Sequence, residues 1–403
     1  MSIESSSAVI IGSGISGLTT AYKLQDSGCS VRVFESGERV GGAMNTHSQN
    51  GWLAEYGPNT ILETSTQIKT LITKLGLDRE KLYPNSVSSN RFIVKNGKLL
   101  PLPLSPLAFI SSALFSTQSK FNIIREPFIP KWQNDYEESL SEFVLRRLGQ
   151  NFLDYAVNPF VAGVFAGDPD RLSVKHALSK LYKLEQNYGS LIKGQIKKAK
   201  LPAEPDDISK NRAKMFSFKN GLQVLPETLA SKLKTPIEFN TRVEQVQKLN
   251  EGWEITYNQQ NEIKTQKADN LIYAGTGHQL ADCKIISDKN VDLSFGNEIE
   301  YPPVATLTLG FHKNQIQHTL NGFGLLVPEV ENLQILGALF TSSLFPYRAP
   351  EDHVTITVFI GGVRQGELAL ESEEKRLDIA LNDLTMLLGI SGSPAFIFHK
   401  KWT

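Results

Sequence analysis

The most constraining feature of the sequence is a glycine-rich turn between a short apolar run and an amphipathic segment near the N-terminus. The pattern predicts a buried strand over Ala8–Ile11 and a helix from the end of the turn through Gln25. It predicts a second strand over Ser30–Phe34. The turn has the spacing G-x-G-x-x-G, formed by Gly12, Gly14 and Gly17. In this context the spacing predicts a βαβ unit of a Rossmann-like α/β fold.

Each glycine of the turn has a physical role in a nucleotide site. Gly12 permits the tight turn, Gly14 lets the backbone approach a pyrophosphate, and Gly17 allows the helix to lie close to the strand. The N–H groups at the start of the helix favour a bound anion. Glu35 ends the second strand and can accept hydrogen bonds from ribose hydroxyls. The residues predicted to bind the nucleotide are Gly12, Ser13, Gly14, Ile15, Ser16, Gly17, Glu35 and Ser36.

Two further glycine-rich turns favour FAD over NAD as the cofactor. One follows the ribose acid and contains Arg39, Gly41 and Gly42; the other is the run Glu55–Thr60. A glycine pair lets the backbone approach a cofactor closely, and Arg39 can neutralise a phosphate or stabilise the loop. Structural turns alone would also account for these glycines, so the assignment rests on the three turns taken together.

Charge, cysteine and histidine content exclude several classes of function. The chain has 42 basic and 42 acidic side chains, so no net charge attracts nucleic acid, and we expect no nucleic-acid partner. Cys29 and Cys283 form no C-x-x-C pair, and the 7 histidines show no ligand spacing, so we predict no disulfide framework and no metal site. The first residues lack the features of a secretory signal, which predicts a cytoplasmic protein.

The pattern predicts a helix over 62–77, a short hairpin over 90–104 with Asn96-Gly97 at its turn, and a strand over Ile237–Val246. It also predicts helices from 136 to 198, a mobile loop from 201 to 214, and a second sheet beyond Val304, followed by an amphipathic helix over Leu368–Leu388. We predict three parts: an FAD-binding domain over 1–85 and 214–300, a substrate-binding sheet domain over 86–105 and 301–395, and a helical subdomain over 106–213. The apolar stretch Leu104–Phe115 is too short to span a bilayer. It either packs in a core or contacts a membrane surface.

Several separate motifs resemble those of one family along nearly the whole chain. They are Glu55–Thr60, Asn90–Ile93, Asn158–Pro169, Leu172–Ala177, Phe216–Gly221, Gly322–Pro328 and Phe345–Pro350. Together with the opening turns, they resemble the oxygen-dependent protoporphyrinogen oxidases of the flavin amine oxidase superfamily. A set of this size is much more specific than a dinucleotide motif alone.

The resemblance implies roles at individual positions. Arg91 matches an arginine that binds a substrate propionate, and a guanidinium suits a carboxylate because it can donate two parallel hydrogen bonds. Gly163 matches a glycine whose carbonyl faces the substrate. The residues that match apolar contacts of the tetrapyrrole are Leu326, Leu339 and Phe359. On the cofactor side, the matches are Ala43, Gly57, Pro58, Asn59, Thr60 and Trp402 near the flavin and Val243 near the adenine.

The implied reaction is the FAD-dependent, six-electron oxidation of protoporphyrinogen IX to protoporphyrin IX in haem biosynthesis, with dioxygen as the acceptor. Coproporphyrinogen III stays open as an alternative substrate. A flavin amine oxidase and a non-catalytic relative of the fold stay open as alternative functions. Relatives continue for several dozen residues beyond the position of Thr403. We therefore expect that a flavin-contacting segment is missing and that this chain alone binds FAD weakly.

Overall fold

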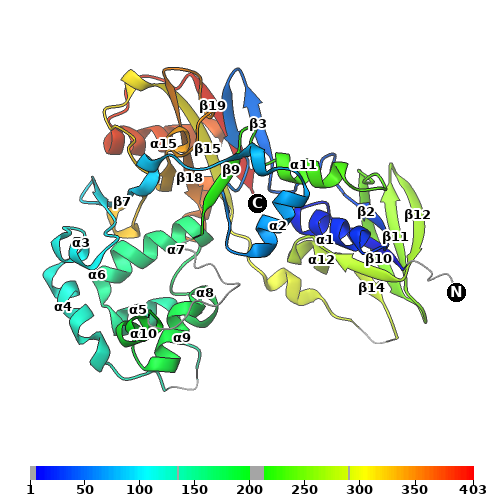
Figure 1. Ribbon diagram of the computed structural model, residues 1–403, viewed down its shortest axis with the longest axis horizontal. Coiled ribbons are helices and arrows are strands. Elements are labelled where there is room, and N and C mark those ends of the chain that lie inside the picture. The colour runs from blue at the N-terminus through cyan, green and yellow to red at the C-terminus, as the bar shows by residue number, and fades with distance from the viewer. Residues whose placement is uncertain (1–5, 134–135, 200–212, 289–290) are drawn as a thin grey trace. The chain divides into compact units, whose positions relative to one another are not determined.

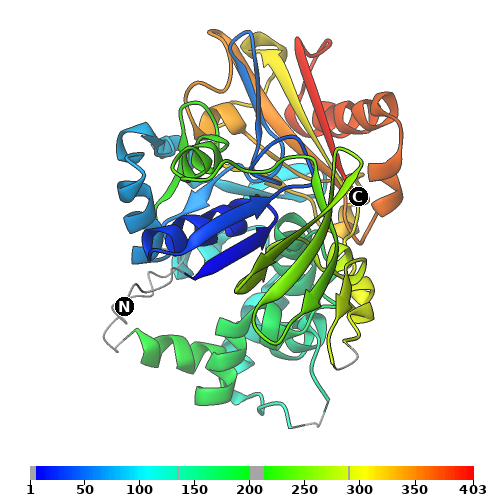
Figure 2. The same cartoon turned by 90° about the vertical axis from the view of Figure 1, so that its right-hand side faces the viewer.

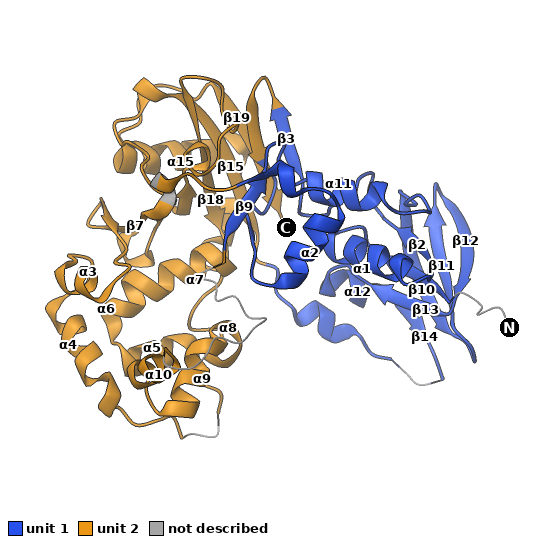
Figure 3. Ribbon diagram, in the orientation of Figure 1, with its two compact units in different colours: residues 1–48, 55–82, 214–301 blue, residues 49–54, 83–213, 302–403 orange. Residues whose placement is uncertain are grey.

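The computed structural model describes residues 6–133, 136–199, 213–288 and 291–403. The chain divides into two compact units, each assembled from segments that are distant in the sequence (Figure 3). Unit 1 consists of Met1–Ser48, Glu55–Leu82 and Lys214–Tyr301; unit 2 consists of Gln49–Ala54, Tyr83–Ala213 and Pro302–Thr403. The mobile loop expected at 201–214 falls almost entirely outside the described residues.

Unit 1 contains the predicted βαβ unit. Strand β1 (Ser7–Ile11) lies between β2 (Ser30–Phe34) and β13 (Asn270–Tyr273) in a parallel sheet. Helix α1 (Ile15–Asp26) connects β1 to β2, because parallel neighbours need a crossover rather than a hairpin. It buries Leu18 completely against the core of the unit.

A second, largely antiparallel sheet completes the strand structure around the βαβ unit. It contains four strands in the order β12 (Glu262–Ala268), β11 (Trp253–Gln259), β10 (Thr241–Lys248) and β14 (Lys284–Ile286). Figure 2 shows these strands in green beside the dark blue strands β1 and β2. The strand that the sequence predicted from Ile237 begins only at Thr241, and this boundary was wrong. Before that start, Glu238 forms only an isolated parallel bridge with Phe34 of β2: the Glu238 N–H donates to Val33 O and the Glu35 N–H donates to Glu238 O, both at 2.9 Å.

Short elements fill the rest of unit 1. The helix expected over 62–77 covers only α2 (Thr66–Lys74), because Leu62 belongs to strand β5 and pairs with Met215. Ser65 caps α2 by accepting from the Ile68 N–H. The other elements are β3 (Thr46–Gln49), β4 (Trp52–Glu55), β5 (Ile61–Leu62), β6 (Lys81–Leu82), β9 (Met215–Phe218), α11 (Val224–Ser231) and α12 (Gly277–Ala281), with β3 and β4 shared between the units.

Unit 2 is built on a seven-stranded sheet. Its order is β19 (Phe396–Trp402), β15 (Val304–His312), β18 (His353–Gly361), β17 (Ile335–Leu339), β16 (Gly324–Leu326), β7 (Arg91–Lys95) and β8 (Lys98–Pro101). The predicted hairpin turn between β7 and β8 is present, with Asn96 at φ 52° and Gly97 at φ 68°. Positive φ at two adjacent positions matches the strand twist of a tight hairpin and favours the pair Asn-Gly.

One face of this sheet forms the main core of unit 2. Inward residues such as Leu307, Ile356 and Val358 pack under α15 (Glu373–Leu388), which Figure 1 and Figure 2 show in orange-red along the sheet. The helix expected over Leu368–Leu388 is two helices, with α14 (Gly366–Leu370) separate from α15. The break occurs because Ser372 caps α15 by accepting from the Lys375 N–H.

Helices between β8 and β16 form the rest of unit 2. They are α3 (Pro106–Ser111), α4 (Thr117–Arg125), α5 (Leu140–Arg147), α6 (Gln150–Phe152), a π-helical turn η4 (Leu153–Val157), α7 (Asn158–Phe165), α8 (Val174–Ala177), α9 (Ser179–Tyr188) and α10 (Leu191–Lys198). The predicted division of this unit into a sheet domain and a helical subdomain stays a prediction. Among the described residues, every helix is too short or too polar to cross a bilayer.

Candidate functional site

The glycine-rich turn adopts the geometry that a nucleotide site requires. Gly12 has φ 102°, and its N–H donates to Phe34 O at 2.8 Å. A Cβ on Gly17 would lie 2.0 Å from the Gly12 carbonyl oxygen, so only glycine lets α1 approach the turn this closely. A Cβ on Gly14 would meet no atom within 4 Å, so the turn is open at this position. Ile15 and Ser16 begin α1, whose N-terminus has no side-chain cap.

The Glu35 side chain forms hydrogen bonds to Ser13 of the glycine-rich turn and to the backbone of Gly37. Its carboxylate accepts from the Ser13 N–H at 2.8 Å, from Ser13 Oγ at 2.6 Å and from the Gly37 N–H at 2.8 Å. Because a carboxylate has about four lone-pair positions, it retains capacity for a further donor such as a ribose hydroxyl. Glu35 also lines a cavity of about 500 Å³ together with Gly37, Glu38, Arg39 and Gly42. Ser36 is exposed next to it.

The second glycine turn lies directly beside the first. The Gly41 N–H donates to Ser13 O at 2.9 Å, and a Cβ on Gly42 would lie 3.5 Å from the Gly14 Cα. Arg39 supports this loop, because its Nη2 donates to Gly42 O at 3.1 Å and its guanidinium lies 5.5 Å from the centre of the Tyr56 ring. The two turns therefore form one continuous backbone surface in unit 1.

The segment that carries the predicted flavin contacts is held by a buried carboxylate. A Cβ on Gly57 would lie 2.7 Å from Ala43 O, so these two residues are adjacent. Asn59 is buried; its amide donates to Gly57 O at 3.3 Å, while its Oδ1 has no partner among the described residues. Glu55 is buried and accepts from Thr46 Oγ1 at 2.7 Å and from the Leu222 N–H at 2.9 Å. Glu55 was predicted only as part of a motif, and this role was not predicted from the sequence.

A tyrosine that was not selected from the sequence lies at the end of β13, one residue before Ala274, which contacts Gly12 of the first glycine turn. Tyr273 ends β13, and its hydroxyl donates to Thr276 O at 2.8 Å. Burial raises the pKa of Tyr273 to about 12, so the phenol stays a neutral donor at physiological pH. The adjacent Ala274 lies against Gly12: a Cβ on Gly12 would be 3.1 Å from the Ala274 carbonyl oxygen. Val243, predicted near the adenine, packs in the core cluster that contains Phe34.

These observations fit a bound dinucleotide cofactor. Gly14 leaves open space beside an uncapped helix N-terminus, which favours a pyrophosphate. Glu35 lines a cavity with acceptor capacity that remains free, and Asn59 has an unsatisfied buried oxygen. Pro58 and Thr60 flank Asn59, with Pro58 exposed. The cofactor residues predicted from the sequence lie in unit 1, except Trp402, which lies in β19 of unit 2 opposite Val304.

The residues predicted to bind the substrate share one face of the sheet of unit 2. Arg91 pairs with Gly324, which pairs with Leu339. In the next row, Leu326 pairs with Gly337, which pairs with Phe359. Directly paired residues, and residues two apart on one strand, point to the same side of a sheet. This side is opposite to the face covered by α15.

Two cations lie on this face of β7, and of the two only Lys95 donates side-chain hydrogen bonds to the described residues. The Lys95 ammonium donates to Leu114 O and Ala113 O and lies 4.8 Å from the Tyr155 ring centre. Arg91 is exposed; its guanidinium lies 5.3 Å from the Phe323 ring centre, and none of the described carboxylates forms an ion pair with it. Arg91 is therefore available to an anionic ligand.

Gly163 contacts this face through Leu326. A Cβ on Gly163 would lie 2.4 Å from Leu326 Cδ2, so the glycine allows α7 to approach β16. The role of the Gly163 carbonyl towards a substrate stays a prediction.

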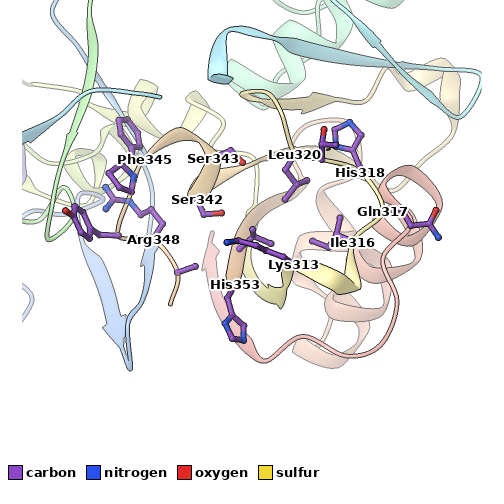
Figure 4. A pocket seen from close by; sticks show the side chains of 15 residues that line it. Lys313, Ile316, Gln317, His318, Leu320, Ser342, Ser343, Phe345, Arg348 and His353 are labelled. Atoms are coloured by element: carbon purple, nitrogen blue, oxygen red, sulfur yellow. Dashed lines mark hydrogen bonds between the residues drawn. The ribbon is translucent and has the colours of Figure 1, made fainter. Parts of the chain in front are cut away.

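A separate cavity of about 620 Å³ lies in unit 2 at α13 (Thr341–Leu344) and the start of β18 (Figure 4). Its lining includes Lys313, His318 and His353. Burial lowers the pKa of His318, whose Nδ1 accepts from the Leu320 N–H at 3.0 Å. None of the site residues predicted from the sequence lines this cavity, so we assign it no part in the predicted site.

Comparison with known proteins decides the family. The profile of the flavin-containing amine oxidoreductases matches residues 15–403. The chain belongs to this family. The predicted FAD-dependent oxidoreductase class and the predicted flavoprotein fold are confirmed by this membership.

Individual relatives extend the comparison. Protoporphyrinogen oxidase 2 of Arabidopsis thaliana is 36% identical to this chain over 98% of the chain and 82% of the relative. Coproporphyrinogen III oxidase of Bacillus subtilis is 26% identical over 98% of the chain and 85% of the relative. The crystal structure of a candidate protoporphyrinogen oxidase from an Exiguobacterium species superposes with a TM-score of 0.81 at 22% identity, over 99% of this chain and 86% of that one, which shows a shared fold. The predicted resemblance to protoporphyrinogen oxidases is confirmed.

Proposed function

We propose that the protein oxidises a porphyrinogen to a porphyrin with FAD and dioxygen, and that its substrate is protoporphyrinogen IX. The observation that carries this proposal is the shared face of the sheet in unit 2. Leu326, Leu339 and Phe359 form an apolar surface from three strands, and the exposed Arg91 lies on the same face of a fourth strand, in the row of Leu339. A flat, hydrophobic ligand with carboxylates at its edge matches this arrangement.

The residues of this chain would act by binding and positioning. In the proposed complex, Arg91 binds a propionate and fixes the orientation of the macrocycle, while the apolar residues exclude water from its face. Bound FAD would supply a two-electron acceptor that dioxygen reoxidises, so a six-electron oxidation takes three rounds. Ser13, Gly14 and the N-terminus of α1 would hold the pyrophosphate, and Glu35 would hold the ribose.

Protoporphyrinogen IX is preferred over coproporphyrinogen III for two reasons. The relatives named protoporphyrinogen oxidase have the higher identity to this chain. Coproporphyrinogen carries two additional propionates in place of two vinyl groups. On the face described above, Arg91 is joined by apolar residues at the predicted substrate positions, which suits vinyl groups better than carboxylates.

The test is a porphyrin fluorescence assay of the purified chain with added FAD and each porphyrinogen. We expect oxidation of protoporphyrinogen IX to be faster. Arg91→Ala should lower kcat/KM by about 10- to 150-fold, because it removes a charge-assisted interaction of about 1.5–3 kcal/mol. Arg242→Ala, at an exposed position of β10, is the control and should leave activity unchanged. Turnover of a primary amine but of neither porphyrinogen would contradict the proposal, as would an active enzyme that binds no flavin.

A cytoplasmic location with peripheral membrane contact is the second part of the proposal. Leu114 and Phe115 of the predicted contact segment are buried, but Leu107 and Ile110 on α3 are 80% and 64% exposed. Phe128 is 84% exposed, and the Lys193 ammonium lies 5.8 Å from its ring centre. Exposed apolar side chains next to a cation suit a phospholipid surface. Cosedimentation with phosphatidylglycerol vesicles tests this: the chain should pellet with them, and full recovery in the supernatant would refute the contact.

A further inference from the structure

Helix α7 is attached to the sheet of unit 2 at both of its ends. At its C-terminal end, Ala166 O accepts from the Val363 N–H at 2.8 Å. At its N-terminal end, Asn158 Oδ1 accepts from the Glu329 N–H at 3.0 Å, and Asn158 Nδ2 donates to Glu329 Oε2 at 3.0 Å. The residues on the sheet side follow β18 and β16, the strands that carry Phe359 and Leu326. The helix is therefore tied to two of the predicted substrate strands.

A single arginine joins these attachments. Arg364 follows the turn at Gly361 and Gly362, which have φ 103° and 73°. Its Nη1 lies 3.4 Å from Asn158 Oδ1, and both Nη1 and Nη2 donate to Val327 O at 3.3 Å. Val327 comes directly after Leu326 in the sequence. The side chain thus links the first residue of α7 to the end of β16.

The environment of Arg364 is unfavourable for a charge. Burial lowers the pKa of its guanidinium, an effect that the charge of Glu329 partly opposes. Its Nε is buried with no partner among the described residues. Both contacts are with neutral oxygens at long distances, so simple stability does not explain an arginine here. The geometry of the guanidinium explains it, because this one planar group contacts both Asn158 of α7 and Val327 directly after β16.

The contact between α7 and β16 that Arg364 stabilises includes Leu326, one of the predicted substrate residues. Leu326 Cδ2 occupies the space where a Cβ of Gly163 would lie, and it is also 3.2 Å from the Cβ position of Gly337. Leu326 is therefore fitted between α7 on one side and the sheet surface on the other. A shift of α7 relative to β16 would move this leucine, because close-packed neighbours leave it little free space.

We propose that Arg364 is a positioning residue that holds α7 against β16 and thereby sets the position of Leu326 on the surface that receives the macrocycle. This inference rests on the proposed function for its substrate and on the described contacts for its mechanism. Arg364 touches neither the macrocycle nor the cofactor in this role. It acts through Asn158, Val327 and Leu326.

The test compares variants of two arginines with similar chemistry. Arg376 is also buried, also has an Nε without a partner, and donates from Nη1 to Ala369 O at 3.1 Å and to Glu371 O at 2.5 Å, but it lies on α15 at the opposite face of the sheet. Arg364→Met keeps the length of the side chain and removes its donors, Arg364→Lys keeps the charge, and Arg376→Met is the control.

We expect Arg364→Met to raise KM for the porphyrinogen at least 10-fold while kcat changes less than 3-fold, and Arg364→Lys to restore part of the loss. Arg376→Met should lower the thermal midpoint without changing KM. An equal effect of both methionine variants on KM, or none from Arg364→Met, would overturn the proposal. If Arg364→Met does not fold, Arg364→Lys is tested in its place, and a raised KM with a nearly unchanged kcat in that variant supports the proposal.

Hydrogen exchange separates this inference from the proposed function, because it needs no substrate. The backbone amides of Asn158–Phe165 should exchange at least 10-fold faster in Arg364→Met than in the unmodified chain and in Arg376→Met. If exchange is faster in Arg364→Met but the unmodified chain oxidises no porphyrinogen, the proposed function is refuted and the attachment of α7 by Arg364 is still supported. Unchanged exchange would refute the attachment itself.

Discussion

Asp383 on α15 bonds to the backbone at the start of β17, and its replacement gives a sharp test of the fold. It is buried, and its Oδ2 accepts from the Gln334 N–H at 2.8 Å and from the Ile335 N–H at 3.0 Å. Asp383→Leu removes the oxygen that accepts both hydrogen bonds and leaves the buried Ile335 N–H without a partner, whereas Gln334 is exposed and its N–H can bond to water. One unsatisfied buried group costs about 1–3 kcal/mol, so the variant should lose about 1–3 kcal/mol of unfolding free energy.

Asp383→Asn is the matched variant. Both donors bond to the same oxygen, so an amide oxygen in that place can accept from both without a buried charge. Burial raises the pKa of Asp383, an effect that the two backbone hydrogen bonds partly offset. The folded state therefore binds a proton more readily than the unfolded state, and the stability that protonation provides is lost as pH rises through the folded pKa. The Asn variant should accordingly gain stability relative to the unmodified chain between pH 4 and pH 7.

The assay is urea denaturation of the three proteins at both pH values, followed by circular dichroism. We expect the Asn variant to be as stable as the unmodified chain, or more stable, at pH 7, with the Leu variant well below both. The reasoning is refuted if the Leu variant unfolds at the same urea concentration as the Asn variant. A relative stability of the Asn variant that falls from pH 4 to pH 7 would refute the sign of the pKa argument.

The remaining predictions concern the glycine turn and the buried charges of the helical region. Gly17→Ala should destabilise unit 1 and lower the yield of folded protein, because its Cβ would lie 2.0 Å from a backbone oxygen, whereas Gly14→Ala should fold normally and weaken FAD binding in a flavin fluorescence titration. Normal folding of Gly17→Ala would contradict the first expectation. Glu126→Gln should cost about 3–5 kcal/mol in chemical denaturation, because Glu126 and its ion-pair partner Arg147 are both fully buried. A cost below about 1 kcal/mol would show that Glu185, the other partner of Arg147, compensates.

Local patterns allowed much of the fold to be predicted from the sequence. The β1–α1–β2 unit and the Asn96-Gly97 hairpin were identified from residues adjacent in the chain, because backbone sterics and helix or strand periodicity act over a few positions. Element boundaries were less certain where distant segments compete for the backbone. Residues 237–240 were expected to be strand, yet of these only Glu238 pairs with a strand, as an isolated bridge to Phe34 of β2.

The sequence by itself determined the flavoprotein class of this protein and the glycines that a nucleotide turn requires. Only the tertiary structure decided which residues work together: that Glu35 binds Ser13, that Arg91 shares a face with Leu339, and that Arg364 reaches Asn158 across 206 positions of the chain. Contacts of this kind depend on strand order and register, which no local pattern specifies, since the same alternating residues can pair in many sheets. The predicted site residues thus gain a common face from the fold, while their roles in catalysis stay predictions.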